Sequence, residues 1–122
     1  MNIKEQLISD LKKRHEIESQ RIKSETQYST VCWALETFGI DALTKVEGTY
    51  LKLVEEMEEF KEAYESGDKA KICDEAADLM VLLVQVVHHF NENLYKQFEA
   101  KMHVNRNRKW DKTAVGNYQH VD

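Results

Sequence analysis

The sequence has 122 residues, of which 42% are hydrophobic and 32% are charged, and its formal net charge at pH 7 is -5. This length fits one domain, and the negative charge argues against general binding to nucleic acids or to anionic membranes. Proline is absent and only four glycines occur, which is too few turn residues for a β-rich chain. Composition therefore predicts an all-α protein with few breaks.

The N-terminal segment, residues 3–23, is rich in charged residues, which is unlike a secretory signal peptide and predicts a helical arm over about 1–24. Cys32 and Cys73 have neither a disulfide-framework nor a zinc-finger spacing, so we expect two reduced thiols. The longest strictly apolar run, residues 79–84, is too short to cross a bilayer. We therefore expect a soluble cytoplasmic protein with no membrane partner.

Further helices are expected over residues 25–38, 41–65, from 69 past 90, and 94–108. Gly39 fits a helix C-cap and Asp41 the next N-cap, while residues 66–68 fit a turn between two helices. The tail, residues 111–122, is expected to be irregular. Residues 1–122 are thus predicted to form a single helical domain with an arm and a tail.

Two patterns of apolar residues indicate which helix faces are buried. The helix expected over 41–65 has an apolar stripe with spacings of three and four residues, which predicts a face turned to a core: Tyr50, Leu53, Met57, Phe60 and Tyr64. Residues 79–87 are apolar on every side of their helix, apart from Gln85, and such a helix is buried all round. So short a chain has little interior, so we expect this helix at the centre of a homo-oligomer, a dimer or a tetramer. A central helix in a monomeric bundle is the alternative.

Acidic residues concentrate between Glu55 and Asp78, and within this segment two pairs have a spacing of three residues: Glu56 with Glu59, and Glu75 with Asp78. Each pair lies on one face of its helix, so antiparallel packing of the two helices would bring all four carboxylates together. Oxygen ligands of this kind suit Mg²⁺ or Mn²⁺. A di-iron site would need Glu-x-x-His pairs, which the sequence lacks. A solvated acidic face is the alternative.

Basic residues predominate between Lys101 and Lys112. An acidic and a basic cluster in one small domain suggest a phosphate-bearing ligand, with a metal ion between carboxylates and phosphates. A surface helix end, where cations are favoured by the helix dipole, is the plainer interpretation of the basic segment. A weak nucleic-acid patch is a further alternative, with little support in an acidic protein.

These residues resemble a known family. The segment KLVEEMEEF at 52–60, followed by EAADL at 75–79, looks like the E-x-x-E…E-x-x-D signature of the MazG-like all-α nucleoside triphosphate pyrophosphatases. Relatives include dimeric dUTPases, dCTP pyrophosphatases and phosphoribosyl-ATP pyrophosphatases. The segment KMHVNRNRKW at 101–110 is similar to the family's K-M-x-x-N-x-R segment. The resemblance covers about residues 33–110 and implies a helical bundle of the MazG-like type, completed by oligomerisation.

The resemblance also implies an activity, which is Mg²⁺-dependent hydrolysis of a nucleoside triphosphate to the monophosphate and pyrophosphate. Carried over by position, it implies metal ligands at Glu56, Glu59, Glu75 and Asp78, with Mg²⁺ or Mn²⁺ as the cofactor. Glu55 matches an acid that some relatives use as general base. Phosphate-contacting positions match Lys101, Asn105 and Arg108.

Base recognition is less well defined by the resemblance, because Leu82 stands where several relatives carry an aromatic residue, and Glu58 where several have glycine. Trp33 and Phe38 offer a stacking surface for a base, with core packing as the alternative. His88 and His89 are expected to be structural. We therefore expect a nucleotide pyrophosphohydrolase that clears or controls a (deoxy)nucleotide.

Three alternatives to this function remain open at the level of sequence. The first is an enzyme that resembles the phosphoribosyl-ATP pyrophosphatases. The second is a non-catalytic helical interaction or regulatory protein with a solvated acidic face. The third, with least support, is a DNA-binding helix pair near the basic residues 12–21.

Overall fold

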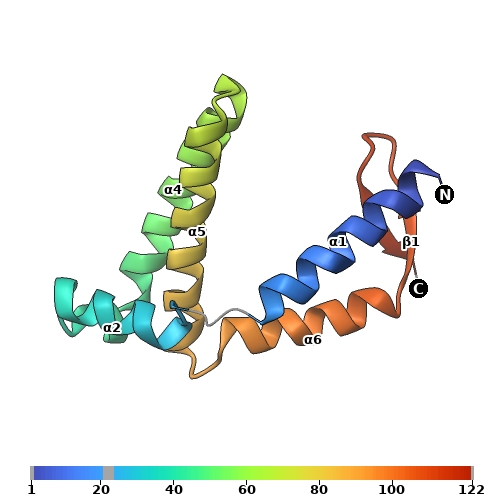
Figure 1. The fold of residues 1–122 in the computed structure, drawn as a ribbon. Coiled ribbons are helices and arrows are strands. Elements are labelled where there is room, and N and C mark those ends of the chain that lie inside the picture. The colour runs from blue at the N-terminus through green and yellow to red at the C-terminus, as the bar shows by residue number, and fades with distance from the viewer. Residues whose placement is uncertain (1, 21–23, 122) are drawn as a thin grey trace.

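The computed structural model describes residues 2–20 and 24–121 and is mainly helical (Figure 1). The predicted all-α class is confirmed, with one small exception in the tail. None of the described helices is both long enough and apolar enough to cross a membrane. The elements in chain order are α1 (Ile3–Ser19), α2 (Gln27–Phe38), α3 (Asp41–Thr44), α4 (Val46–Ser66), α5 (Lys69–His89), α6 (Leu94–Arg106), β1 (Lys109–Lys112) and β2 (Tyr118–Val121). The predicted arm, about 1–24, includes residues 21–23, which lie outside the described residues.

The centre of the fold is an antiparallel hairpin of α4 and α5, which pack along each other (Figure 1). The turn between them is the one predicted at residues 66–68. Gly67 adopts a left-handed conformation with φ 72° and ends α4, donating its N–H to the carbonyl of Tyr64. Asp68 caps α5 by accepting hydrogen bonds from the N–H groups of Ala70 and Lys71. So tight a turn fixes which residues of the two helices face each other.

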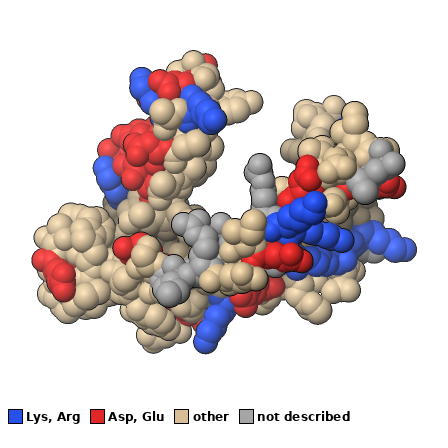
Figure 2. Space-filling view, viewed as in Figure 1, with Lys and Arg blue, Asp and Glu red and all other residues tan. Residues whose placement is uncertain are grey.

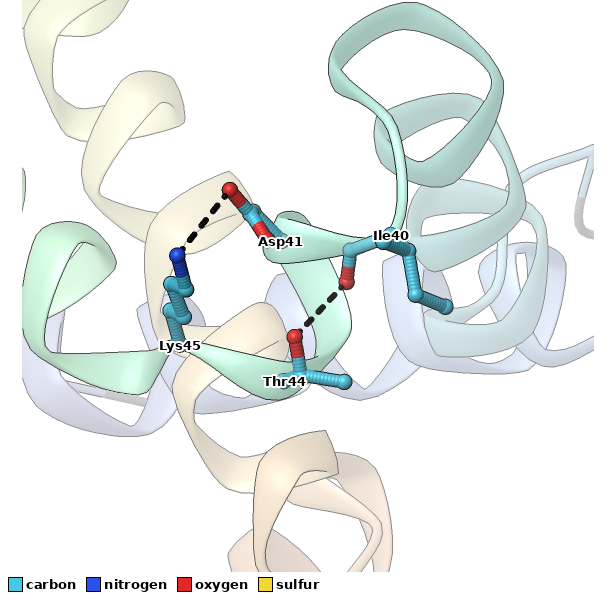
Figure 3. A network of polar contacts seen from close by, with 4 residues as sticks. All are labelled: Ile40, Asp41, Thr44 and Lys45. Atoms are coloured by element: carbon cyan, nitrogen blue, oxygen red, sulfur yellow. Dashed lines mark hydrogen bonds and ion pairs between the residues drawn. The ribbon is translucent and has the colours of Figure 1, made fainter.

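Helices α2 and α3 pack against α5. Gly39 ends α2 with φ 87°, as the sequence predicts, and its N–H binds the carbonyl of Leu35. The single helix predicted over 41–65 is instead interrupted at Lys45, where φ −118° and ψ 81° leave the helical region. Asp41 is not an N-cap: it lies inside α3, and its carboxylate is 3.5 Å from the Lys45 ammonium (Figure 3). The short α3 therefore forms a separate wall beside α5.

A buried glutamine holds α2 against the corner where α5 gives way to α6. Gln27 is 1% exposed, and its amide nitrogen lies 2.7 Å from the carbonyl of Glu92 and 3.3 Å from Nδ1 of His88. Its amide oxygen accepts the N–H of Leu94 at 2.7 Å. These contacts fix where α6 begins. From that corner α6 runs away from the α4–α5 hairpin (Figure 1).

The tail is not irregular, as was predicted for 111–122. β1 and β2 form an antiparallel hairpin, in which the rings of Trp110 and His120 pack edge to face with centroids 5.9 Å apart. The indole N–H of Trp110 also donates to the carbonyl of Asn105 at 2.9 Å, which anchors the hairpin on the end of α6. These contacts depend on the packing of Trp110 against its partners, which the helix and turn patterns of the sequence analysis did not include.

The chain buries few apolar side chains on its own: the fully buried ones among the described residues are Val31, Ala34, Ala63 and Val84. The prediction that the whole apolar stripe faces a core is wrong, since Tyr50, Met57 and Tyr64 are 50–70% exposed. Only Leu53 and Phe60 of that stripe are half-buried. The α5 stretch predicted to lie at the centre of a homo-oligomer has Met80 and Leu83 exposed in the single chain, so its burial between copies stays a prediction.

Candidate active site

The first component of the site is a carboxylate inside the helix hairpin. The face that α4 turns to α5 contains Leu53, Glu56, Phe60 and Ala63, and both Glu56 and Ala63 are buried. Spacings of three and four residues place these side chains on one helical face. A buried glutamate between two helices needs a partner, because an ionised carboxylate is strongly disfavoured away from water.

Besides the Lys52 ammonium, the neighbours of Glu56 are two more acids. Glu75 and Asp78 on α5 offer carboxylate oxygens that lie, together with one from Glu56, within 4.8 Å of one another. Glu56 Oε2 and Glu75 Oε2 are both buried and have no hydrogen-bond partner. Donors made only of oxygen, converging from two helices with two unpaired buried atoms, fit a divalent cation such as Mg²⁺ or Mn²⁺.

Crowding of these acids shifts their proton affinities. Burial, followed by the neighbouring carboxylates of Glu56 and Glu59, raises the pKa of Glu75 to about 7. A carboxyl–carboxyl hydrogen bond with Glu56 raises the pKa of Glu59, and the same hydrogen bond lowers the pKa of Glu56. Glu75 therefore binds a proton near neutral pH when no cation compensates the charge of the cluster.

The fourth predicted ligand, Glu59, lies next to this group. It is one helical turn from Glu56 and lines a small cavity of about 330 Å³ together with Glu75. The predicted general base, Glu55, is exposed and joined to the cluster through a lysine: Nζ of Lys52 lies 3.4 Å from Oε1 of both Glu55 and Glu56. The structure thus brings together Glu56, Glu75 and Asp78 most closely, with Glu59 and Glu55 at their border.

A large cavity of about 1000 Å³ opens beside the carboxylates and is lined by both Glu56 and Asp78. Trp33 and Phe38, the residues predicted to contact a base, also line it, and their rings pack edge to face with centroids 5.3 Å apart. Helix α3 forms part of the same wall, where the hydroxyl of Thr44 donates to the carbonyl of Ile40 (Figure 3). The cavity therefore joins an acidic end to an aromatic end.

The predicted phosphate-binding residues do not join this cavity. Lys101 and Asn105 lie on α6 and Arg108 lies just after its end, and among the described helices the one that α6 packs on most is α5, at their connecting corner. Asn105 is half-buried with an unpaired Oδ1, and a guanidinium nitrogen of Arg108 lies 3.4 Å from Nδ1 of His120. Figure 2 shows a patch of acidic side chains on the α4–α5 hairpin, with basic ones at its tip, and basic and acidic side chains mixed on the other arm of the molecule.

Sequence reasoning missed two polar residues of the cavity wall, Gln85 and His89. Both lie on α5, seven and eleven residues after Asp78, which is the spacing of one helical face. That spacing was the available signal, but His89 was expected to be structural along with its neighbour. The expectation agrees with the contacts of His88, which faces Gln27 and the ring of Tyr28.

Comparison with known proteins adds to this geometry. The model of the phosphoribosyl-ATP pyrophosphohydrolase family matches residues 34–105, a range that contains all four predicted metal ligands. A solved structure of a MazG-like pyrophosphohydrolase of cyanophage S-2L, bound to dGDP and three catalytic Mn²⁺ ions per active site, is similar to this chain with a TM-score of 0.61 and 22% identity. The similarity covers 85% of this chain and 97% of that one, and it shows a shared fold. Among curated proteins none matches the chain.

Proposed function

The chain belongs to the phosphoribosyl-ATP pyrophosphohydrolase family and is a nucleotide pyrophosphohydrolase, and from that premise we propose that it hydrolyses a nucleoside triphosphate to the monophosphate and pyrophosphate. The observation that carries this proposal is the convergence of Glu56, Glu75 and Asp78 beside a cavity that Glu56 and Asp78 line together with the aromatic side chains of Trp33 and Phe38. A triphosphate would lie over the carboxylates, and its base would reach Trp33 and Phe38.

We propose Mg²⁺, or Mn²⁺ in its place, as the cofactor held by Glu56, Glu59, Glu75 and Asp78. A divalent cation bound there would neutralise phosphate charge and lower the pKa of a water molecule for attack on the α-phosphorus. The two unpaired buried oxygens of Glu56 and Glu75 support this assignment. The cyanophage protein, which has the same fold, is bound to Mn²⁺ in its solved structure, and this supports the assignment further.

Glu55 is proposed as the general base that accepts the proton of the attacking water. Its carboxylate is exposed and shares the Lys52 ammonium with Glu56, so it lies at the border of the cluster and outside its buried part. An exposed carboxylate keeps room for a water molecule between itself and the substrate. The bond from the α-phosphorus to the bridging oxygen then breaks, and pyrophosphate leaves.

We propose that two or more copies of the chain complete the site. A folded monomer of this mass exposes about 6,800 Å² by the usual scaling of surface with mass, whereas this chain exposes 10264 Å². The excess of about 3,500 Å² per chain corresponds to about 7,000 Å² in total for a dimer, which is the scale of the largest obligate interfaces. A homo-oligomer, a dimer or a tetramer, would cover the bare apolar faces of α4 and α5. It would also let Lys101, Asn105 and Arg108 of one copy reach the phosphates bound by another.

The test is release of pyrophosphate from ribo- and deoxynucleoside triphosphates, with and without Mg²⁺ or Mn²⁺. We expect cation-dependent release that falls roughly 100-fold or more in Glu75→Gln, since even residues that only support metal ligands are worth 10- to 100-fold. Glu58→Gln is the matched control, because it makes the same change at an exposed position of α4. Equal rates in the two variants would contradict the proposed site.

Phosphoribosyl-ATP should be tested as a second substrate in the same assay, because the matching family is named after its hydrolysis. Turnover of phosphoribosyl-ATP together with failure on all simple triphosphates would assign the chain to that reaction. The proposed role is control or removal of a (deoxy)nucleotide in the cytoplasm, and it predicts turnover of at least one simple triphosphate. A well-folded protein with no turnover of any substrate would favour the non-catalytic alternative.

A further inference from the structure

Two polar side chains on the cavity wall have no part in the proposed hydrolysis. Gln85 and His89 lie one turn apart on the same face of α5, beyond Asp78 and toward the aromatic end of the cavity. Both are half-buried. A polar group on the wall of a binding cavity selects ligands by whether it offers them a hydrogen-bond donor or an acceptor.

The side chain of Gln85 can offer a ligand a hydrogen-bond acceptor. Its amide nitrogen donates to the carbonyl of Val81 at 3.2 Å. A carbonyl can only accept, so this contact fixes the orientation of the amide, with the nitrogen toward Val81 and Oε1 turned away from it. Among the described residues Oε1 has no hydrogen-bond donor.

The ring of His89 can also offer a ligand a hydrogen-bond acceptor, because its other nitrogen binds a backbone carbonyl. Its Nδ1 lies 3.1 Å from the carbonyl oxygen of Leu43 on α3. Because that oxygen can only accept, Nδ1 must carry a proton, and in the uncharged form of the ring Nε2 keeps its lone pair. The contact also ties α5 to α3 across the cavity wall, so the ring is held in place. Within the described part of the chain Nε2 makes no hydrogen bond.

We propose that this pair of acceptors makes the cavity selective for nucleotides whose base carries an exocyclic amino group. The inference rests on the proposed function, because it assigns the base end of the same cavity. The exocyclic amino group of adenine, cytosine or guanine carries two N–H donors, which two acceptors can satisfy. Uracil and thymine instead present a single ring N–H between two keto oxygens, and hypoxanthine presents one beside a single keto oxygen. Those keto oxygens would face lone pairs.

The size of the preference follows from the burial of the two groups. Leaving a buried acceptor unpaired lowers affinity by roughly 5- to 150-fold, and half-buried groups belong in the lower part of that range. We therefore expect a preference of roughly 10-fold for the amino-bearing member of each matched pair. The aromatic pair Trp33 and Phe38 would stack on any base, so it adds affinity without distinguishing these pairs.

The experiment compares nucleotides that differ by one amino group: dATP with dITP, dGTP with dITP, and dCTP with dUTP. Pyrophosphate release gives kcat/KM for each, and calorimetric binding of the corresponding monophosphates gives affinities that do not depend on turnover. We expect the amino-bearing member to be preferred in both measurements. Equal or reversed preference in the binding measurement overturns the inference, whether or not the triphosphates are hydrolysed.

Variants assign the preference to the named side chain. Gln85→Met keeps the size of the side chain and removes its acceptor, so the ratio within each pair should fall toward one while binding of dIMP is retained. Gln6→Met is the matched control, since Gln6 is an exposed residue of α1 whose amide binds Asp10 four residues along the helix. An unchanged ratio in Gln85→Met overturns the role of this residue. Absence of hydrolysis with an intact binding preference would instead count against the proposed hydrolysis.

Discussion

Glu56 and Glu75 face each other across the interface of α4 and α5, and each has one buried carboxylate oxygen without a hydrogen-bond partner. Two such atoms in one interface are unfavourable unless a proton or a cation lies between them. The raised pKa of Glu75, about 7, is the response of the protein in the absence of a cation. This relationship links the stability of the hairpin to pH and to divalent metal.

Binding of a divalent cation is expected to release protons. Glu75 binds a proton below pH 7 because its pKa is raised to about 7 by burial and by its acidic neighbours, and a cation must displace that proton. Apparent affinity for Mg²⁺ or Mn²⁺ should therefore rise as the pH increases from 6 to 8. Calorimetry at pH 6 in two buffers of different ionisation enthalpy measures the number of protons released. A pH-independent affinity with no proton release would contradict the assignment of Glu75 as a ligand.

The substitution Glu75→Gln is expected to stabilise the metal-free protein at pH 8. A carboxyl whose pKa is raised on folding contributes stability below its unfolded pKa of about 4.5, and that contribution is lost as the pH rises through about 7. Glutamine cannot ionise, so the variant avoids this loss. Thermal unfolding in the presence of a chelator should show a higher Tm than the unsubstituted protein at pH 8 and little difference near pH 4.5.

With a divalent cation present, the order of stabilities should reverse. The unsubstituted protein gains stability from binding to the folded state alone, whereas Glu75→Gln lacks one of the ligands. The same thermal scans, repeated with Mn²⁺ in excess, make this comparison. A Tm of Glu75→Gln that rises as much as that of the unsubstituted protein would separate Glu75 from the metal site.

Loss of the buried amide of Gln27 is expected to destabilise the fold. Gln27→Ala removes hydrogen bonds to Glu92 and Leu94 and leaves the freed backbone groups at the corner between α5 and α6 unpaired. We expect a loss of about 2–4 kcal/mol in the free energy of unfolding. Urea denaturation measures it, and Gln6→Ala at an exposed position should remain within about 0.5 kcal/mol of the unsubstituted protein.

A site shared between chains predicts complementation by two inactive variants. Glu75→Gln loses a metal ligand, and Lys101→Met loses a phosphate contact that lies on the other arm of the chain. In a dimer that pairs at random, half the dimers are mixed and each of those has one intact site, so equal mixing should restore about a quarter of the activity. Pyrophosphate release after co-refolding of the two variants measures it. A mixture as inactive as its components would place both residues in sites formed by one chain.

Local signals in the sequence predicted the elements that build the site. The turn at Gly67 and the cap at Asp68 follow from residue types with strong conformational preferences, and they set the antiparallel pairing of α4 and α5. With that pairing, the two three-residue spacings were enough to expect Glu56 next to Glu75. Gln85 was missed as part of the cavity wall because its seven-residue spacing from Asp78 was not considered, and a single polar residue in an apolar stretch does not indicate a site by itself.

Features that depend on side-chain packing were not predictable from the residue patterns alone. Met57 and Tyr64 fit an apolar stripe, but the face turned to α5 is the one that contains Glu56, so the hydrophobic pattern pointed to the wrong side of the helix. The β-hairpin of the tail depends on the contact of Trp110 with His120 and with the end of α6. The break at Lys45 contains neither proline nor glycine and so has no sequence signal.

The small number of apolar side chains buried within one chain has a consequence for how the protein tolerates mutation. In most enzymes of this size, damaging substitutions fall on interior positions and surface positions vary freely. Here Leu51, Met57 and Leu83 are 40–57% exposed in the single chain yet lie on the faces that neighbouring copies would cover. A saturation mutagenesis map of this protein should therefore show intolerance to charged residues at these outward-facing positions, and selection should constrain them as tightly as Val84 in the interior.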